Sequence, residues 1–187
     1  MGKGIECLKT KKYEDALNEF LKALTYPKNL GVGAPYAPHR HEAKQKYWLG
    51  QCYSLIGKKE KAREVWESIF TQKFFTTEEI YYKGLALKMF GRRKEASRIF
   101  KDKLEEASRR EKEITSIKKE ILKEYFNVLN YDKELIEIYC TKLISYLGLD
   151  NKKKAKIELK KALKIKKTAV FIKKPFESCP FYVSIKN

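Results

Sequence analysis

The residues most suited to ligand binding or catalysis lie together in one glycine- and proline-rich stretch, "YPKNLGVGAPYAPHRHEA". It holds both histidines of the chain in an H-x-H pair, with Glu42 directly after them. Such a group could ligate a metal ion, and Gly31 and Gly33 could bring backbone N–H groups close to an anion. However, no further histidine completes the ligand set, and no Gly-Lys-Ser/Thr sequence follows the glycines. We therefore expect no metal, no cofactor and no catalytic residue here.

The prolines of the same stretch favour a structural role. Pro27, Pro35 and Pro38 restrict the backbone and suit a stiff excursion that ends one helix and begins another. We interpret residues 27–42 as an insert loop between two helices, with a docking surface for a neighbouring domain as the alternative. The residues that would make this interdomain contact are Asn29, Leu30, Gly31, Gly33, Pro35 and Tyr36.

The other nucleophilic and titratable groups form no catalytic arrangement. The four cysteines are Cys7, Cys52, Cys140 and Cys179, without a C-x-x-C pair, and we expect them to be reduced and mostly buried. No Ser/His/Asp or Cys/His arrangement is recognisable, because both histidines lie in one loop. The sequence therefore predicts a protein that is not an enzyme.

The formal charge of +18 raises the question of a nucleic-acid partner. Only seven of the 42 basic residues are arginines, although arginine is the side chain that binds phosphates bidentately. The pairs Arg92-Arg93 and Arg109-Arg110 could contact phosphates, but cations at helix ends also suit the helix dipole. Most lysines alternate with glutamates along amphipathic segments. We interpret them as a solvated coat, so nucleic acid is a possible but disfavoured partner.

A repeat organises the rest of the chain. "LGQCYSLIGKKEKAREVW" and "KGLALKMFGRRKEASRIF" share small residues, a glycine and a large aromatic residue in one frame, and Ala62 and Ala96 are 34 residues apart. This period is typical of tetratricopeptide repeats, which are hairpins of two helices. Further copies centre on Ala16 and Ala155. The alanines and glycines allow close helix approach, and Gly57 and Gly91 end the first helix of their hairpins.

Two inserts interrupt this period. Ala16 precedes Ala62 by 46 residues, and Ala96 precedes Ala155 by 59 residues. We predict an all-α fold, a right-handed superhelix of about four tetratricopeptide-like hairpins with two inserts. The repeat domain spans residues 1–167 with the insert loop 27–42 and an insert helix 110–130, and residues 168–187 form an extended cap or a disordered tail. The expected helices are 2–9, 12–26, 42–56, 59–71, 77–90, 93–108, 112–129, 132–148 and 151–166.

The repeats resemble the tetratricopeptide superfamily. More narrowly, "ALTYPKNLGVGAPY" with "YWLGQCYSLIGKKEKAREVW" is similar to the C-terminal helical-repeat region of bacterial proteins that carry an N-terminal β-sandwich domain of unknown function. This resemblance implies that the chain is a fragment or a degenerate relative. It also implies the alternative that the chain is an accessory helical region of a larger carbohydrate-active enzyme.

The first helices of the second and third hairpins would line the inner face of the repeat. The candidate partner-binding residues there are Lys44, Tyr47, Trp48, Gln51, Leu55, Tyr81, Tyr82, Leu85, Lys88 and Met89. Aromatic rings edged by lysines suit a peptide, and filling the space between helices is the alternative role of the tyrosines. We predict a scaffold for a protein, peptide or neighbouring domain. No segment is long and apolar enough to span a membrane, and neither signal nor transit peptide is recognisable, so we expect a cytoplasmic protein with no membrane partner.

Overall fold

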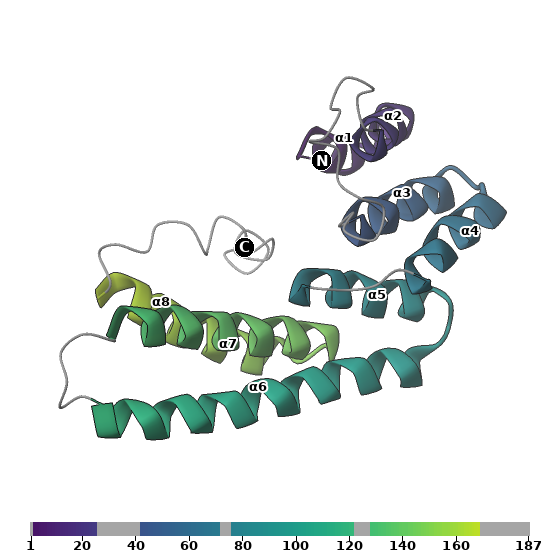
Figure 1. The fold of residues 1–187 in the computed structure, drawn as a ribbon. Coiled ribbons are helices and arrows are strands. Elements are labelled where there is room, and N and C mark those ends of the chain that lie inside the picture. Colours follow the sequence, from purple (N-terminus) through teal and green to yellow (C-terminus); the bar gives the residue numbers. More distant parts are fainter. Residues whose placement is uncertain (1, 26–41, 72–75, 122–127, 169–187) are drawn as a thin grey trace, which may run out of the picture. The chain divides into compact units, whose positions relative to one another are not determined.

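The computed structural model describes residues 2–25, 42–71, 76–121 and 128–168, and all regular structure within these ranges is helical (Figure 1). The helices are α1 (Gly2–Lys9), α2 (Tyr13–Leu24), α3 (Ala43–Leu55), α4 (Lys59–Phe70), α5 (Thr77–Met89), α6 (Arg93–Ile121), α7 (Val128–Gly148) and α8 (Lys152–Thr168). The chain divides into two compact units, Met1–Ala96 and Ser97–Asn187. The predicted all-α fold built of consecutive hairpins is confirmed.

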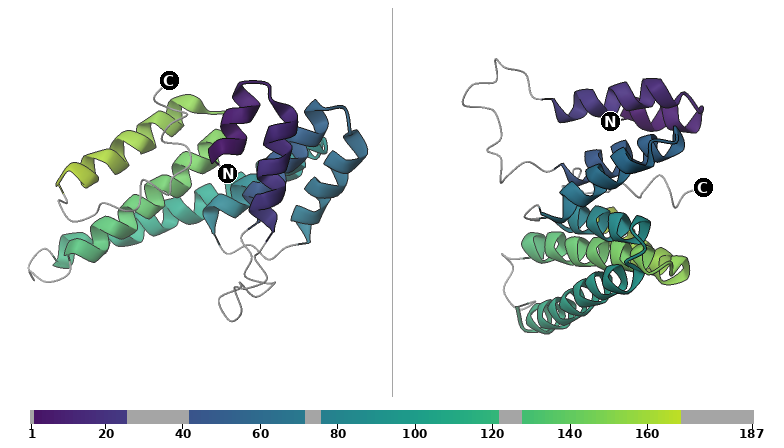
Figure 2. Two further views of the ribbon diagram at one scale, coloured as in Figure 1. Left: turned by 90° about the horizontal axis from the view of Figure 1, so that it is seen from above. Right: turned by 90° about the vertical axis from the view of Figure 1, so that its right-hand side faces the viewer.

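In the first unit, α1 packs on α2 and α3 packs on α4, and the two hairpins are joined by contacts between α2 and α3. Helix α5 packs on both α3 and α4, as the first helix of a following repeat does. Figure 2 shows the two hairpins in this order. The alanines that define the repeat, Ala16, Ala62 and Ala96, are all buried. Their burial is what the predicted stacking of hairpins requires, because close approach leaves no room for a larger side chain.

The connection inside each hairpin has one geometry at four places. The residue five positions before each repeat alanine has a positive φ: 58° at Lys11, 82° at Gly57, 79° at Gly91 and 58° at Asp150. The next residue donates its N–H to the carbonyl five residues earlier, as in Lys58 to Tyr53 (2.9 Å) and Asn151 to Tyr146 (2.8 Å). A hydrogen bond of this span, directly after a residue in the left-handed region, is characteristic of the Schellman motif that ends a helix. The role expected for Gly57 and Gly91 is therefore confirmed, and two residues other than glycine adopt it as well.

A glycine opposite an aromatic ring closes each of the first two hairpins. A Cβ added at Gly4 would lie 2.7 Å from the Phe20 ring, and one added at Gly50 would lie 2.2 Å from Trp66 Nε1. Trp66 Nε1 also donates to the backbone oxygen of Tyr47 at 3.1 Å. The aromatic residue thus packs on its own hairpin, while Phe20 also joins a core cluster with Leu49 of the next hairpin.

In the second unit, α7 and α8 form a hairpin, visible side by side in Figures 1 and 2. Its alanine Ala155 is buried, but its first helix carries Leu143 where the other repeats have a glycine. Gly148 instead faces Phe100 of α6, with the ring 2.5 Å from the position of an added Cβ. Ala107 and Ile114 of α6 share a core cluster with Leu135 and Ile138 of α7. Helix α6 is thereby fixed on the hairpin.

Helix α6 differs from the prediction of two helices, 93–108 and 112–129. It is continuous from Arg93 to Ile121 and includes the first part of the expected insert helix 110–130. No glycine or proline interrupts residues 109–111, and Arg109 and Glu113 form an i,i+4 pair (3.9 Å) across the expected break. Strong helix formers with no breaker continue a helix. The remaining described bounds lie within two residues of the prediction, except that α7 begins four residues early.

Three predictions concern residues outside the described ranges in whole or in part. The insert loop 27–42 is described only at Glu42, and the segment 168–187 only at Thr168. Cys179 also lies outside the described residues. Cys7, Cys52 and Cys140 are free thiols, as expected, but only Cys52 is buried, whereas Cys7 and Cys140 are partly exposed, so the expected burial holds for one of the three. Burial raises the pKa of the Cys52 thiol, which favours its neutral form.

Candidate partner-binding face of helices α3 and α5

The ten residues predicted to bind a partner lie on two helices that pack on each other, α3 and α5 of the first unit. We call them the α3–α5 face: Lys44, Tyr47, Trp48, Gln51 and Leu55 on α3, and Tyr81, Tyr82, Leu85, Lys88 and Met89 on α5. The two helices are equivalent in the repeat, so the residues correspond at a distance of 34. Trp48 corresponds to Tyr82 and Leu55 corresponds to Met89. Eight of the ten residues thus form four matched pairs on neighbouring repeats, whereas Lys44 and Lys88 correspond to Glu78 and Ser54, which are not members of the face.

An ion pair joins the two helices where they begin. Lys44 Nζ lies 2.8 Å from Glu78 Oε1, and both side chains are about one-third exposed. Glu78 occupies the α5 position that corresponds to Lys44. A capping box fixes the start of α5, since Glu79 N–H donates to Thr76 Oγ1 (3.2 Å) and Thr76 N–H donates to Glu79 Oε2 (3.1 Å). The Lys44 ammonium is therefore already held by this chain.

Aromatic rings fill the middle of the face. The Tyr47 ring centroid lies 5.4 Å from that of Trp48 and 5.5 Å from that of Tyr82, and Tyr82 lies 5.5 Å from Tyr81. Gln51 Nε2 donates to the Tyr47 hydroxyl at 3.1 Å. These tilted and edge-on contacts are the arrangements that aromatic pairs prefer. The rings pack the two helices together, which is the role that the sequence left open for the tyrosines.

Burial separates the tyrosines into core and surface. Tyr82 is only 3% exposed and belongs to a core cluster with Trp66 and Ala86, whereas Tyr47 and Tyr81 pack at its edge. Burial raises the pKa of both Tyr47 and Tyr82, and the Gln51 hydrogen bond offsets part of the rise at Tyr47. Tyr82 can therefore position its neighbours but has almost no surface for a partner.

Trp48 is also directed into the protein. Its indole Nε1 is buried and has no hydrogen-bond partner of good geometry among the described residues. Its interaction with the Tyr82 side chain offsets part of the rise that burial causes in the Tyr82 pKa. The indole therefore contributes packing to the middle of the face.

The far end of the face is open. Leu55 and Met89, the last residues of α3 and α5, are 53% and 45% exposed. They are corresponding residues of consecutive repeats, and each lies four residues beyond another member of the face, Gln51 and Leu85. Side chains at this spacing share one side of a helix. The apolar surface that this chain leaves uncovered thus lies at the carboxyl ends of the two helices.

Sequence reasoning missed the residues that hold the face together. Glu78, which pairs with Lys44, and Trp66, which donates to the Tyr47 carbonyl, were not assigned to it. Glu78 follows from the 34-residue correspondence with Lys44, whereas Trp66 packs opposite Gly50 within one hairpin. A search for charge pairs at corresponding positions would have identified Glu78.

The other side chains considered as metal ligands or phosphate-binding groups are either dispersed or already in ion pairs. The interdomain residues Asn29, Leu30, Gly31, Gly33, Pro35 and Tyr36 and both histidines lie outside the described residues. Within the described ranges, no group of three or more histidine, cysteine or carboxylate side chains could hold a metal ion. Arg92 pairs with Glu95 (2.6 Å) and lies over the Phe70 ring, and Arg110 pairs with Glu134 (2.8 Å). These arginines already have anionic partners.

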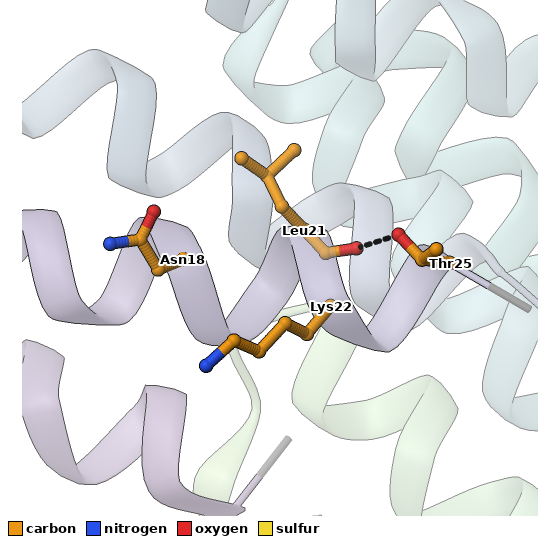
Figure 3. A pocket seen from close by; sticks show the side chains of 4 residues that line it. All are labelled: Asn18, Leu21, Lys22 and Thr25. Carbon is orange, nitrogen blue, oxygen red and sulfur yellow. Dashed lines mark hydrogen bonds between the residues drawn. The ribbon is translucent and has the colours of Figure 1, made fainter. Parts of the chain in front are cut away.

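Two surface hollows border the first hairpin, away from the predicted face. The larger has a volume of about 510 Å³ and is lined by Asn18, Leu21, Lys22 and Thr25 of α2 (Figure 3). Thr25 Oγ1 donates to the Leu21 carbonyl at 3.0 Å, so the hydroxyl is already bonded to its own helix. A second hollow extends to Lys3, Glu6 and Cys7 of α1. Neither contains a residue of the α3–α5 face.

A family model described as tetratricopeptide repeat matches residues 136–168, which cover most of α7 and all of α8. Together with the all-helical hairpins, this match supports the tetratricopeptide superfamily and fits a protein-interaction scaffold in general. No curated protein matches the chain. No solved structure matches it either. Among the described helices, none is both long and apolar enough to cross a membrane.

Proposed function

We propose that this chain is a non-enzymatic scaffold that binds a peptide segment of a partner protein, or of a neighbouring domain, at the α3–α5 face. The observation that carries the proposal is the pair of exposed apolar residues, Leu55 and Met89, at corresponding positions of consecutive repeats. Two uncovered apolar side chains at corresponding positions of two packed helices are anchor points that an extended peptide can contact.

The geometry suggests that different residues of the face would position the helices and contact the peptide. The Lys44–Glu78 pair and the tilted contact between the Tyr47 and Tyr82 rings fix α3 against α5, so the face is organised before a partner arrives. Leu55 and Met89 would then supply the apolar contact, with Gln51 beside them to donate or accept a hydrogen bond. We expect the preferred peptide to present apolar side chains to this end.

The test selects peptides from an unbiased displayed library on the full chain and measures the affinity of the selected peptides. Replacing Leu55→Ser and Met89→Ser together should weaken binding roughly tenfold or more, because each buried aliphatic side chain contributes about 1.5–3 kcal/mol. Helical circular dichroism should be unchanged, since both side chains are exposed.

The structure offers a matched control. Leu21 and Ile157 are the other large apolar residues with exposed side chains among the described residues, at 40% and 53%. Leu21→Ser with Ile157→Ser removes a similar apolar area elsewhere and should leave the affinity within about twofold. Equal loss in both double variants, or a library that yields no binding peptide, would contradict the proposal.

The finer predictions of the sequence stay predictions. These are the role of the loop 27–42 in an interdomain contact, the context of an N-terminal β-sandwich domain with its carbohydrate-active alternative, and the cytoplasmic location. The absence of enzymatic activity is likewise part of the proposal. It is supported by the repeat match, since tetratricopeptide-type repeats are in general binding scaffolds.

A further inference from the structure

The last described helix, α8, has an unusual concentration of lysines. Nine of its 17 residues are lysines and a single one, Glu158, is acidic. Glu158 is only 6% exposed and its carboxylate pairs with Lys161 at 3.1 Å. The only negative charge of the helix is therefore directed inward.

The lysines divide between an inner and an outer side. Lys154 lies over the Tyr146 ring (5.6 Å), and Lys161 lies over the Tyr139 ring (5.3 Å) and near Glu111. In contrast, Lys152, Lys153, Lys156 and Lys160 are exposed and have no ion-pair partner among the residues that the structure describes. We call these four the α8 lysine group.

The α8 lysine group lies opposite the packed side of the helix. Ala155 and Ala162, which are seven residues apart, are buried against the hairpin, and Ile136 of α7 packs on Ala162. Lys153 and Lys160 are also seven residues apart, and each lies two residues before one of these alanines. Because two residues correspond to a rotation of about 200° around a helix, the two lysines face away from that core. From Lys152 to Lys160 the helix rises roughly 12 Å, which places four cations within a short row along the helix.

A row of exposed cations on one helix, without ion-pair partners among the described residues, fits a polyanion of high charge density. Duplex DNA carries one negative charge for about 1.7 Å of its axis, and binding releases the counterions that this density condenses. The second unit as a whole also attracts such a ligand, with 23 basic and 13 acidic residues. All four groups are lysines, which act as point charges on phosphates and do not read base edges in a bidentate way.

A lipid surface fits the same residues less well. An interfacial helix inserts a broad apolar face into the membrane, but the apolar side of α8 is packed on α7. Ile157 is the only large apolar side chain of α8 that is exposed among its described residues. One isoleucine supplies little insertion energy.

We propose that the α8 lysine group binds the phosphate backbone of nucleic acid without sequence preference. This site lies in the second unit and does not depend on the α3–α5 face, so one can fail without the other. It also locates a function that the sequence disfavoured, because the sequence showed an even lysine coat while the structure leaves four neighbouring lysines on one helix without acidic partners.

The experiment measures binding of the full chain to fluorescent DNA of mixed sequence, single-stranded and duplex, over a range of salt concentrations. Replacing all four residues of the α8 lysine group by glutamine should weaken binding about a hundredfold or more at 0.1 M salt. It should also reduce the slope of log K against log salt by about 3 units for single strands. Affinity should not change with base sequence.

The control carries the same change of net charge elsewhere. Lys59, Lys61, Lys101 and Lys112 are exposed helical lysines without an ion-pair partner among the described residues, and their replacement by glutamine should have a much smaller effect on both quantities. Equal effects of the two quadruple variants would overturn the site. Tighter binding to polyglutamate or to phosphatidylserine vesicles than to DNA would overturn the choice of ligand. Circular dichroism of both variants checks that the helices persist.

Discussion

At the scale of single residues, the hairpins depend on pairs of one very small and one very large side chain. Gly50 leaves space for the Trp66 indole, whose N–H then reaches the Tyr47 carbonyl. Gly4 does the same for Phe20. In the second unit Phe100 uses Gly148, a glycine at a different position of the repeat. The second unit therefore also packs a glycine against an aromatic ring, although the glycine occupies another position of the repeat.

Gly50→Ala should destabilise the protein by roughly 2 kcal/mol or more, although alanine is the better helix former. The new Cβ would lie 2.2 Å from Trp66 Nε1, so the buried ring has to move and its hydrogen bond to Tyr47 is lost. Urea unfolding followed by circular dichroism measures the change.

Gly2→Ala is the control for this prediction. No atom lies within 4 Å of the position of a Cβ at Gly2, so alanine should be neutral or slightly stabilising there. If Gly50→Ala were as harmless as Gly2→Ala, close contact between glycine and indole would not be what holds this hairpin together.

The sequence identified these residues by size but not all of their contacts. The recurrence of small residues in one frame predicted close helix approach at the repeat alanines, and these alanines are buried. The contact between Phe100 and Gly148 was not predicted, because the other copies have no glycine at the position of Gly148. Tyr82 was assigned to the binding surface, yet it is buried, since a tyrosine in an amphipathic helix can be directed either way.

At the scale of elements, the turns inside the hairpins are uniform although their sequences are not. Lys11 and Asp150 adopt the same left-handed conformation as Gly57 and Gly91. A side chain with a Cβ is strained there by about 1–2 kcal/mol. The surrounding hydrogen bonds, Lys12 to Cys7 and Asn151 to Tyr146, hold the backbone in place. Sequence inspection found only the two glycine-containing turns, because glycine is the usual signal.

Lys11→Gly should therefore stabilise the protein by about 0.5–1 kcal/mol, as relief of strain exceeds the added freedom of the unfolded chain. Gly57→Ala should destabilise it by about 1 kcal/mol for the opposite reason. The Gly57 position is sterically open, so only the backbone conformation is tested there. Thermal and urea unfolding of both variants check the two signs, and equal signs would exclude strain as the cause.

Helix α6 is held to α7 by a buried ion pair and an exposed one. Lys142, which is only 8% exposed, donates to Glu111, and Lys161 of α8 lies 3.9 Å from the same carboxylate. Arg110 and Glu134 join the same two helices at 2.8 Å with both side chains more than 40% exposed. Neither pair was predicted, since the chain between them departs from the repeat period.

Lys142→Met should destabilise the protein by about 3 kcal/mol, because it leaves the Glu111 carboxylate partly buried without its main cation. Glu111→Leu together with Lys142→Met should recover most of this loss. Arg110→Gln, which breaks the exposed pair between the same helices, should cost less than about 1 kcal/mol. A double-mutant cycle by urea unfolding measures the coupling, and a coupling near zero would contradict this role of Glu111.

At the scale of the whole molecule, most contacts join helices that follow one another along the chain. In the first unit α2 packs on α1 and α3, and α4 packs on α3 and α5. In a linear array of this kind, stability is the sum of local terms and of interfaces between neighbours. The predicted hairpin order is confirmed because it follows from local sequence, whereas the burial of particular tyrosines and lysines depends on contacts distant in the sequence.

Hydrogen exchange of the Gly50→Ala protein should show this locality. Amide exchange should accelerate in α3 and α4 and to a smaller extent in the adjoining α2 and α5, while α7 and α8 keep the exchange rates of the unaltered chain. Mass spectrometry of peptic fragments resolves these helices separately. Uniform acceleration in every fragment would indicate global cooperativity and contradict the prediction.

The uniform turns also determine where the chain tolerates changes of length. From the left-handed residue to the repeat alanine, all four hairpins have the same number of residues, whereas successive repeats differ in spacing by 12 and 25 residues from the period of 34. The departures from the period therefore lie outside these turn segments, one between α2 and α3 and the other in the long helix α6 and the chain that leads to α7. The α3–α4 hairpin contains no such departure, so tandem copies of residues 42–71 should be suitable building blocks for designed arrays.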